Sequence, residues 1–354
     1  MRDDTQQIPA VTIGLDLGDR MSQVYVVDAA GRCVGEAAVA TTPKALTRYF
    51  TPWRGARVVL EVGTHSPWIS RLLTTLGCEA VVGNPSAMYG ARRRRKRNDR
   101  LDAEYLARQG RADVALLHPI RHRSVTAQQA LTVVRARDQL VSARTKLIGH
   151  VRGAVKALGT RLSACSAEAF ARRAAGELPA PLRPALTPLL QVIADLTRRI
   201  DQADRGIAKL IDTQYPVAKR LQQVAGVGPL TSVSVVLLID DPARFPRSRD
   251  VGAYFGLVPR LDESSDSHPQ LRISKAGDPL GRRLLVSAAH YILGPFGPPC
   301  DLRRYGHALA ARGGRNAKKR AVVAVARKLA VLLHHLWVSN APYDPNYTLT
   351  HHAA

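Results

Sequence analysis

The sequence is poor in cysteine and in aromatic residues. Its four cysteines are scattered, and no two of them form a CxxC pair: Cys33, Cys78, Cys165 and Cys300. This spacing argues against a disulfide framework and against a zinc site, and it is typical of a protein from a reducing cytosol. Aromatic residues make up only 5%. Leu, Val, Ile and Ala must therefore form most of the hydrophobic core.

Long uncharged apolar runs are also missing. No such run reaches about 18 residues, so we expect no membrane span and no membrane partner. The first ten residues, MRDDTQQIPA, lack the apolar stretch of a secretory signal peptide. We therefore expect the protein to act in the cytoplasm of a bacterium, associated with the nucleoid.

Acidic residues are few relative to basic ones. The 354 residues contain 28 Asp and Glu against 52 Lys and Arg, a formal net charge of +24. Such a field attracts polyanions, and arginine favours bidentate contacts with phosphate. Nucleic acid is the expected partner. The simpler interpretation is a soluble basic protein such as a ribosome-associated factor, and nucleic acid is the expected partner of that class as well.

The first 118 residues alternate between strand and helix patterns. Apolar β-rich runs and a helical apolar spacing predict a strand over 11–18, a hairpin over 22–40, strands over 56–63 and 78–85, and helices over 66–77 and 99–108. Such alternation is typical of an α/β domain with a central mixed sheet. We assign residues 1–118 to this domain.

Residues 119–215 have a helical pattern instead. Apolar residues recur at alternating steps of four and three, an a/d seam over three heptads: Leu189, Ile193, Leu196, Ile200, Ala203, Ile207 and Leu210. An earlier run, from Leu147 to Leu162, has similar steps. The helices could pack as a hairpin within one chain or pair two chains as a coiled coil. The regular seam favours dimerisation.

Residues 216–340 form a third, mainly helical segment, followed by a tail over 341–354. Within it, the motif GVGPLT (226–231) places Gly226 and Gly228 before a helix. Backbone N–H groups at a helix N-terminus can bind phosphate. The pattern resembles half of a helix-hairpin-helix DNA-binding element.

Four acids stand at positions that suit a metal site. Asp16 ends the first strand, Glu61 lies in a later apolar strand, and Asp99 and Asp102 are one helical turn apart. Metal-dependent phosphoryl transfer gathers carboxylates around one or two Mg²⁺ ions. The joint pattern predicts such a site.

Each acid also has a simpler interpretation. Asp16 could be a turn residue or part of an actin-like ATPase, Asp99 could cap the helix, and Asp102 could form a surface ion pair. An actin-like fold needs a second glycine-rich phosphate loop. The sequence after residue 116 becomes helical and basic instead, which argues against it.

Several motifs, in order along nearly the whole chain, resemble those of one family. They are GLDLG, LEVG, KRNDRLDAEYLA, GVGPLT, YFGLVPR, RISKAGD, RRLLVSAAHYIL and AKKRAVVAVARKLAVLLHHLW. The chain resembles the DEDD transposases of bacterial insertion sequences, the insertion-sequence one-ten family. The resemblance implies an RNase H-like (RuvC-like) nuclease domain and a separate transposase domain.

The resemblance also implies site residues and a mechanism. Asp16, Glu61, Asp99 and Asp102 match the family's acids, which hold Mg²⁺ or alternatively Mn²⁺. The family's nucleophilic serine follows the GLVPR motif, usually within Asp-Gln-Ser-Gly. This chain reads Asp-Glu-Ser-Ser-Asp over 262–266, so Ser264 matches best and Ser265 is the alternate.

The partners implied by the resemblance are donor and target DNA and a structured guide, the bridge RNA of the element. Strand cleavage and exchange would pass through a serine–DNA link, with the protein as a dimer, or as a dimer of dimers on two DNAs. A Holliday-junction resolvase-like nuclease that uses the acids alone and a non-catalytic nucleic-acid-binding protein remain alternatives.

The basic residues form two groups that could contact nucleic-acid backbones. The first precedes the Asp99 helix and consists of Arg92, Arg93, Arg94, Arg95, Lys96 and Arg97. The second lies in the C-terminal segment and includes Lys275, Arg282, Arg283, Arg303, Arg304, Arg312, Arg315, Lys318, Lys319 and Arg320. Either group could instead be a solvated face.

Overall fold

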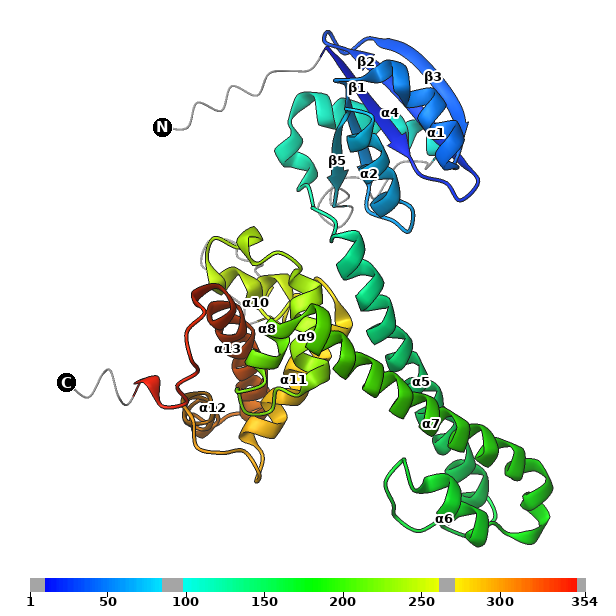
Figure 1. Ribbon diagram of the computed structural model, residues 1–354, viewed down its shortest axis with the longest axis vertical. Coiled ribbons are helices and arrows are strands. Elements are labelled where there is room, and N and C mark those ends of the chain that lie inside the picture. The colour runs from blue at the N-terminus through cyan, green and yellow to red at the C-terminus, as the bar shows by residue number, and fades with distance from the viewer. Residues whose placement is uncertain (1–9, 85–97, 261–270, 349–354) are drawn as a thin grey trace. The chain divides into compact units, whose positions relative to one another are not determined.

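The computed structural model describes residues 10–84, 98–260 and 271–348 (Figure 1). Contacts divide the chain into two compact units, residues 1–122 and 123–354. The first is built on a sheet and the second is helical. This architecture confirms the predicted combination of an RNase H-like mixed-sheet domain with a helical remainder.

The N-terminal unit contains a five-stranded sheet in the order β3-β2-β1-β4-β5. Its strands are β1 (Val11–Asp16), β2 (Met21–Asp28), β3 (Cys33–Ala40), β4 (Arg57–Glu61) and β5 (Glu79–Gly83). The first three strands pair antiparallel, whereas β1, β4 and β5 run parallel. The predicted hairpin over 22–40 is thus β2 and β3.

Helices cover both faces of this sheet. Helices α1 (Pro43–Phe50) and α2 (Ser66–Thr75) pack on the face that carries Ile13 and Leu15. Helix α4 (Asp99–Ala112) packs on the other face. Alternate β1 residues therefore face different helices, because successive strand side chains point to opposite sides.

The C-terminal unit begins with a helical hairpin. Helices α5 (Val125–Lys156) and α7 (Arg183–Gln214) lie side by side, with α6 (Phe170–Glu177) between them in the sequence (Figure 1). The seam residues Ile193, Ile200 and Ile207 are buried within the chain. The heptad pattern thus serves packing inside one chain, and dimerisation through it stays a prediction.

The helical run predicted from Leu147 to Leu162 is wrong at its end. Helix α5 stops at Lys156, and Gly159 adopts a left-handed conformation with φ +77. Leu158 is consequently exposed, while Leu162 is buried beside the hairpin from outside the helix. The prediction failed because the apolar spacing continues along the sequence beyond the turn that ends α5.

The remaining helices form a body around α9, which is buried on all sides. They are α8 (Pro216–Leu221), α9 (Pro229–Ile239), α10 (Val251–Tyr254), α11 (Pro279–Leu293), α12 (Asp301–Ala311) and α13 (Ala317–Ser339). Short 3-10 turns lie at Thr51–Trp53, Val114–Leu117, Ala180–Leu182, Pro242–Arg244 and Ser248–Asp250. The hairpin belongs to the same unit because α5 and α7 pack on α9.

Helix α13 alone among the described helices is long and apolar enough, by length and composition, to cross a membrane. Half of its apolar window is buried inside the unit. Leu329, Ala330 and Leu333 lie in the core cluster of the helical body. These contacts are those of a core helix.

The described part of the predicted tail is attached to the body. The backbone N–H of Asp301 donates to the Pro345 carbonyl at 2.7 Å, and Arg304 donates to Asn346 at 3.0 Å. The Asp301 carboxylate also accepts from the backbone N–H and the hydroxyl of Thr348. These bonds hold residues 341–348 against α12.

Candidate metal centre and nucleic-acid surfaces

Asp16 and Glu61 end two neighbouring parallel strands. Leu15 of β1 pairs with Leu60 of β4, so the two acids are the next residues along each strand. Paired strands lie about 4.8 Å apart. The two acids therefore leave the sheet side by side, at the carboxyl ends of their strands.

Both acids also point to the face that α4 covers. A Cβ atom on Gly14 would stand 1.9 Å from the Ala103 carbonyl oxygen, so this part of β1 touches the helix backbone. A Cβ atom on Gly110 would stand 2.2 Å from Cγ2 of Val59. Side chains two residues apart on a strand point to the same face. Asp16 lies two residues after Gly14, and Glu61 lies two after Val59, so both acids point to the face that α4 covers.

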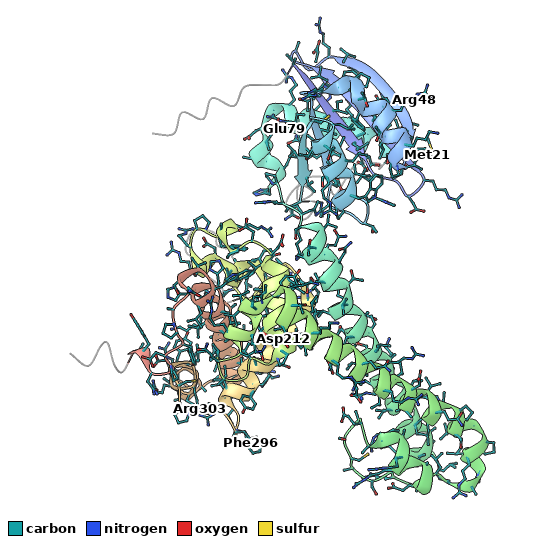
Figure 2. All side chains as sticks on the ribbon, viewed as in Figure 1. Met21, Arg48, Glu79, Asp212, Phe296 and Arg303 are labelled. Atoms are coloured by element: carbon teal, nitrogen blue, oxygen red, sulfur yellow. The ribbon has the colours of Figure 1, made fainter. Side chains whose placement is uncertain are left out.

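Helix α4 runs against β1, with its first turn towards the acids. Near its end, the Gly110 carbonyl accepts from the Arg57 guanidinium at 3.0 Å, and Arg57 begins β4. Arg57 also pairs with Glu79 at 2.9 Å. Glu79, labelled in Figure 2, begins β5. The helix start consequently lies towards the other, carboxyl ends of the strands.

Asp99 and Asp102 occupy this first turn. They fall on the helix stripe that continues through the buried Ala103 and Leu106, because residues three or four apart share one face. Asn98 is the N-cap, since its side-chain oxygen accepts from Arg100 N at 2.8 Å. The simpler interpretation of Asp99 as the cap is therefore wrong, and Asp99 is the first helical residue.

An ion pair fastens this turn to the sheet. The Arg100 guanidinium donates to both carboxylate oxygens of Glu36 on β3. These hydrogen bonds hold the pKa of the Glu36 carboxyl below its ordinary range. The start of α4, with its two aspartates, is thus tied to the antiparallel side of the sheet.

Asp19 and His65 follow the same two strand ends, and they were not predicted as site residues from the sequence. His65 Nε2 lies 3.3 Å from Asp19 Oδ1, and Trp68 Nε1 donates to His65 Nδ1 at 3.0 Å. Since Nδ1 accepts, the ring proton is on Nε2 and points to Asp19. Asp19 comes three residues after Asp16, and His65 four after Glu61, so short acid–His spacings after strands were the available signal.

The donor set suits a hard cation. All four acids supply carboxylate oxygens, which Mg²⁺ prefers. Asp16, Glu61 and Asp102 are half-buried and Asp99 is exposed. Within the described ranges, however, no three His, Cys, Asp or Glu side chains form a group that could hold a metal ion. Asp16 and Glu61 are neighbours at the strand ends, and Asp99 and Asp102 share the first turn of α4; a common metal site for the four acids stays a prediction.

Two groups of predicted site residues, Arg92–Arg97 and Ser264 with Ser265, lie outside the described residues. The chain on either side of 261–270 is ordered as a short antiparallel pair. Arg260 N donates to the Arg272 carbonyl at 3.0 Å, and Ser274 N donates to the Val258 carbonyl at 2.8 Å.

Several predicted backbone-binding arginines are engaged inside the C-terminal unit. Arg282 donates to the carbonyls of Phe255 and Ala276, and Arg283 pairs with Asp138. Arg303 donates to the carbonyls of Ile292 and Gly294, both at 2.6 Å. These contacts give the three arginines a structural role.

Other predicted cations line a groove in the C-terminal unit. Its volume is about 1570 Å³, and it contains Lys275, Arg312, Arg315, Lys319 and Arg320. Lys318 is exposed but does not line it. Arg272, Arg327 and Lys328 line the same groove and were not predicted. For Arg327 and Lys328, exposure to the groove depends on which face of α13 is buried.

Gly226 and Gly228 serve the turn before α9. Gly226 has φ +78, and a Cβ atom there would stand 2.8 Å from the Ala288 carbonyl oxygen. Gly226 is therefore required by the approach of α11. Gly228 is the N-cap of α9 and has open space around it, so phosphate binding at this turn stays a prediction.

Comparison with known proteins gives the family. The transposase IS116/IS110/IS902 family matches residues 218–301, and the DEDD transposase family of IS110 elements matches residues 13–159.

The transposase of insertion sequence element IS1111A from Coxiella burnetii is 32% identical over 258 residues, covering 70% of this chain and 68% of the relative. A probable family 20 transposase from Pseudomonas aeruginosa is 28% identical over 342 residues, covering 94% and 98%. A pilin gene-inverting protein from Moraxella lacunata is 27% identical over 149 residues, covering 41% and 45%. Because the IS1111A relative is 32% identical over 70% of this chain and 68% of its own length, and both family matches agree with it, the chain belongs to the IS110 family of DEDD transposases.

Proposed function

We propose that this transposase is a Mg²⁺-dependent, RNA-guided recombinase that moves its insertion sequence by cutting and exchanging DNA strands. One observation supports the proposal most directly. Asp16 and Glu61 end neighbouring strands on the sheet face that α4 covers, and the first turn of α4 carries Asp99 and Asp102. Carboxylates from two strands and one helix are the donor set that metal-dependent phosphoryl transfer uses.

The four acids would hold the Mg²⁺, or alternatively Mn²⁺. A bound ion would withdraw charge from the phosphate under attack and stabilise the leaving oxygen. The contribution of the chain is to orient the carboxylates. Hydrogen bonds at Asn98 and Arg100 fix the first turn of α4, and strand pairing fixes Asp16 beside Glu61.

Ser264, with Ser265 as alternate, is the proposed nucleophile. Its Oγ would attack phosphorus, so that a serine–phosphate bond forms as a strand P–O bond breaks. The serine proton goes to a base or water, and the departing oxygen takes up a proton. A hydroxyl of a second strand would later displace the serine and restore it.

The proposed partners are donor DNA, target DNA and a bridge RNA, with the protein acting as a dimer or a dimer of dimers in the bacterial cytoplasm. The +24 formal charge supports polyanion binding. Base pairing by a guide would explain how a basic protein selects its sites.

A recombination assay tests the proposal. Donor and target plasmids are incubated with protein, Mg²⁺ and RNA transcribed from the flanks of the element. Asp16→Asn and Glu61→Gln, which keep side-chain size, should lower strand cleavage on the order of a thousandfold through lost transition-state stabilisation. Ser264→Ala should abolish the denaturant-resistant protein–DNA adduct, and Ser265→Ala should leave it; the reverse result would assign the nucleophile to Ser265.

The outcomes separate the alternatives. Cleavage that persists in Ser264→Ala and in Ser265→Ala, but not in Asp16→Asn, would indicate a resolvase-like nuclease that uses the acids alone. Recombination equal in wild type and Asp16→Asn would contradict the metal site. Recombination that needs no added RNA would contradict guidance while leaving the chemistry in place.

A further inference from the structure

A groove in the C-terminal unit, here called the α13 groove, carries a binding surface of its own. It is lined by α12, α13, residues 341–347 and the short pair around Pro259 and Ile273. Its volume of about 1570 Å³ exceeds that of small-molecule pockets, which are about 300–1,000 Å³. The size suits a segment of a polymer.

Positive charge dominates its lining. Eight basic residues line the α13 groove: Arg272, Lys275, Arg312, Arg315, Lys319, Arg320, Arg327 and Lys328. Two acids, Asp301 and Asp344, line it as well. Asp301 accepts from Arg304 and Thr348, which neutralises part of that charge. The excess of cations favours a polyanion.

The groove face of α13 alternates between charge and apolar surface. The cationic pairs Lys319–Arg320 and Arg327–Lys328 are separated by Val323–Ala324, and Val331–Leu332 follows. These repeats are eight residues apart, or about 12 Å along a helix. The opposite face of α13 is buried in the core. A partner in the groove therefore meets cations and apolar side chains in turn.

Tyrosines add flat ring surfaces. Tyr305 is 36% exposed, with Lys328 Nζ 4.1 Å from its ring centroid, and Tyr347 is 54% exposed. The two come from α12 and from the C-terminal segment that hydrogen bonds hold in place. Aromatic rings beside cations are the combination on which unpaired bases stack.

We infer that the α13 groove binds an unpaired nucleic-acid strand. A duplex offers phosphates outward and keeps its bases stacked inside, so it would use the cations but leave the tyrosines and the apolar floor unmatched. An unpaired strand presents both phosphates and base faces. The groove is lined by Pro259 and Arg272, close in sequence to Ser264. The inference rests on the proposed function for its biological meaning, since strand exchange must produce unpaired strands.

Binding is tested on the full chain in the absence of divalent metal, by fluorescence anisotropy. The probes are single-stranded DNA, single-stranded RNA of the same sequence, and the corresponding DNA duplex. The variants are Arg312→Glu with Lys319→Glu, and Tyr347→Leu, which removes the ring but keeps an apolar side chain. The matched control, Arg205→Glu with Arg249→Glu, makes the same charge change at exposed positions outside the groove.

We expect wild type to bind single strands more tightly than duplex. Tyr347→Leu should weaken single-strand binding about fivefold to a hundredfold and leave duplex binding unchanged. The groove charge pair should weaken single-strand binding more than the control pair and reduce its salt dependence. Comparing DNA with RNA identifies which strand the groove prefers, and either preference supports the inference.

Equal weakening by groove and control pairs, or single-strand binding that Tyr347→Leu leaves intact, would overturn the inference. Unchanged far-UV circular dichroism in each variant shows that loss of binding is not loss of fold. The assay needs no cleavage. If the wild-type protein fails to recombine DNA but its groove variants still lose single-strand binding, the proposed function is refuted and the inference about the groove is kept. If the wild-type protein recombines DNA and the groove variants bind single strands normally, the inference about the groove is refuted and the proposed function is kept.

Discussion

Gly14 of β1 lies directly against the backbone of Ala103 on α4, so close that a Cβ atom at residue 14 would stand 1.9 Å from the Ala103 carbonyl oxygen. Only glycine permits this approach. The contact fixes the position of α4 along β1, and the first turn of α4 therefore lies towards the strand end that carries Asp16.

Gly14→Ala should therefore destabilise the N-terminal unit. The added methyl group would force α4 away from β1, and overpacking of this kind costs about 1–3 kcal/mol or more. The free energy of unfolding, measured in denaturant, should fall by at least that amount. Gly63→Ala is the matched control, because a Cβ atom there meets nothing within 4 Å. Similar losses in both variants would contradict the close contact.

Mg²⁺ should stabilise the wild-type fold. In the proposed site an ion would relieve repulsion between carboxylates, and an ion that binds only the folded state raises its stability by about 2.7 kcal/mol at a hundredfold excess over Kd. We expect a rise in Tm with Mg²⁺ that Asp16→Asn and Glu61→Gln lose. A rise of equal size in these variants, or with Na⁺ at matched ionic strength, would count against the site.

Ile200 should matter for the stability of a single chain. It is 3% exposed in the α5–α7 hairpin, so Ile200→Ala should cost about 2–5 kcal/mol. Val192 on the same helix is 46% exposed, and Val192→Ala should change stability by less than about 0.5 kcal/mol. If the seam packs only within one chain, the unfolding midpoint should not depend on protein concentration. A midpoint that rises with concentration would instead indicate that the seam pairs two chains.

Tyr343 should make stability fall at high pH. Burial raises the pKa of Tyr343 from 10.0 to about 12, with the nearby Cys300 and Asp301 adding to the shift. The neutral phenol is thus favoured in the folded state. The contribution of the neutral Tyr343 phenol to the free energy of unfolding is fully present below pH 10, and it is lost as the pH rises from 10.0 to about 12.

Tyr343→Phe should remove this part of the pH dependence. The difference in phenolate absorbance between wild type and variant should develop near pH 12. A difference already complete at pH 10 would show that residues 341–348 do not cover the ring in solution.

Much of the fold could be predicted from local patterns. Alternating apolar residues defined the strands of the sheet, and the GLDLG and LEVG segments indicated where β1 and β4 end. The heptad seam correctly indicated long helices. It could not say whether their partner was the same chain, because an apolar stripe is buried equally well by either. Ile200 is buried within the single chain, in which α5 and α7 pack together, and pairing of two chains through the seam stays a prediction.

The sequence by itself determined the types of chemical group, since the four acids, the cations and the family motifs are local. Tertiary structure decided which of them meet. Parallel pairing puts Asp16 beside Glu61, and the Gly14 contact brings α4 to the same face. The burial of one side of α13 leaves the other as a basic groove, while Arg282 and Arg283, equally basic in the sequence, are engaged within the fold. Charge is a property of the residue, whereas its availability depends on what the rest of the chain packs against it.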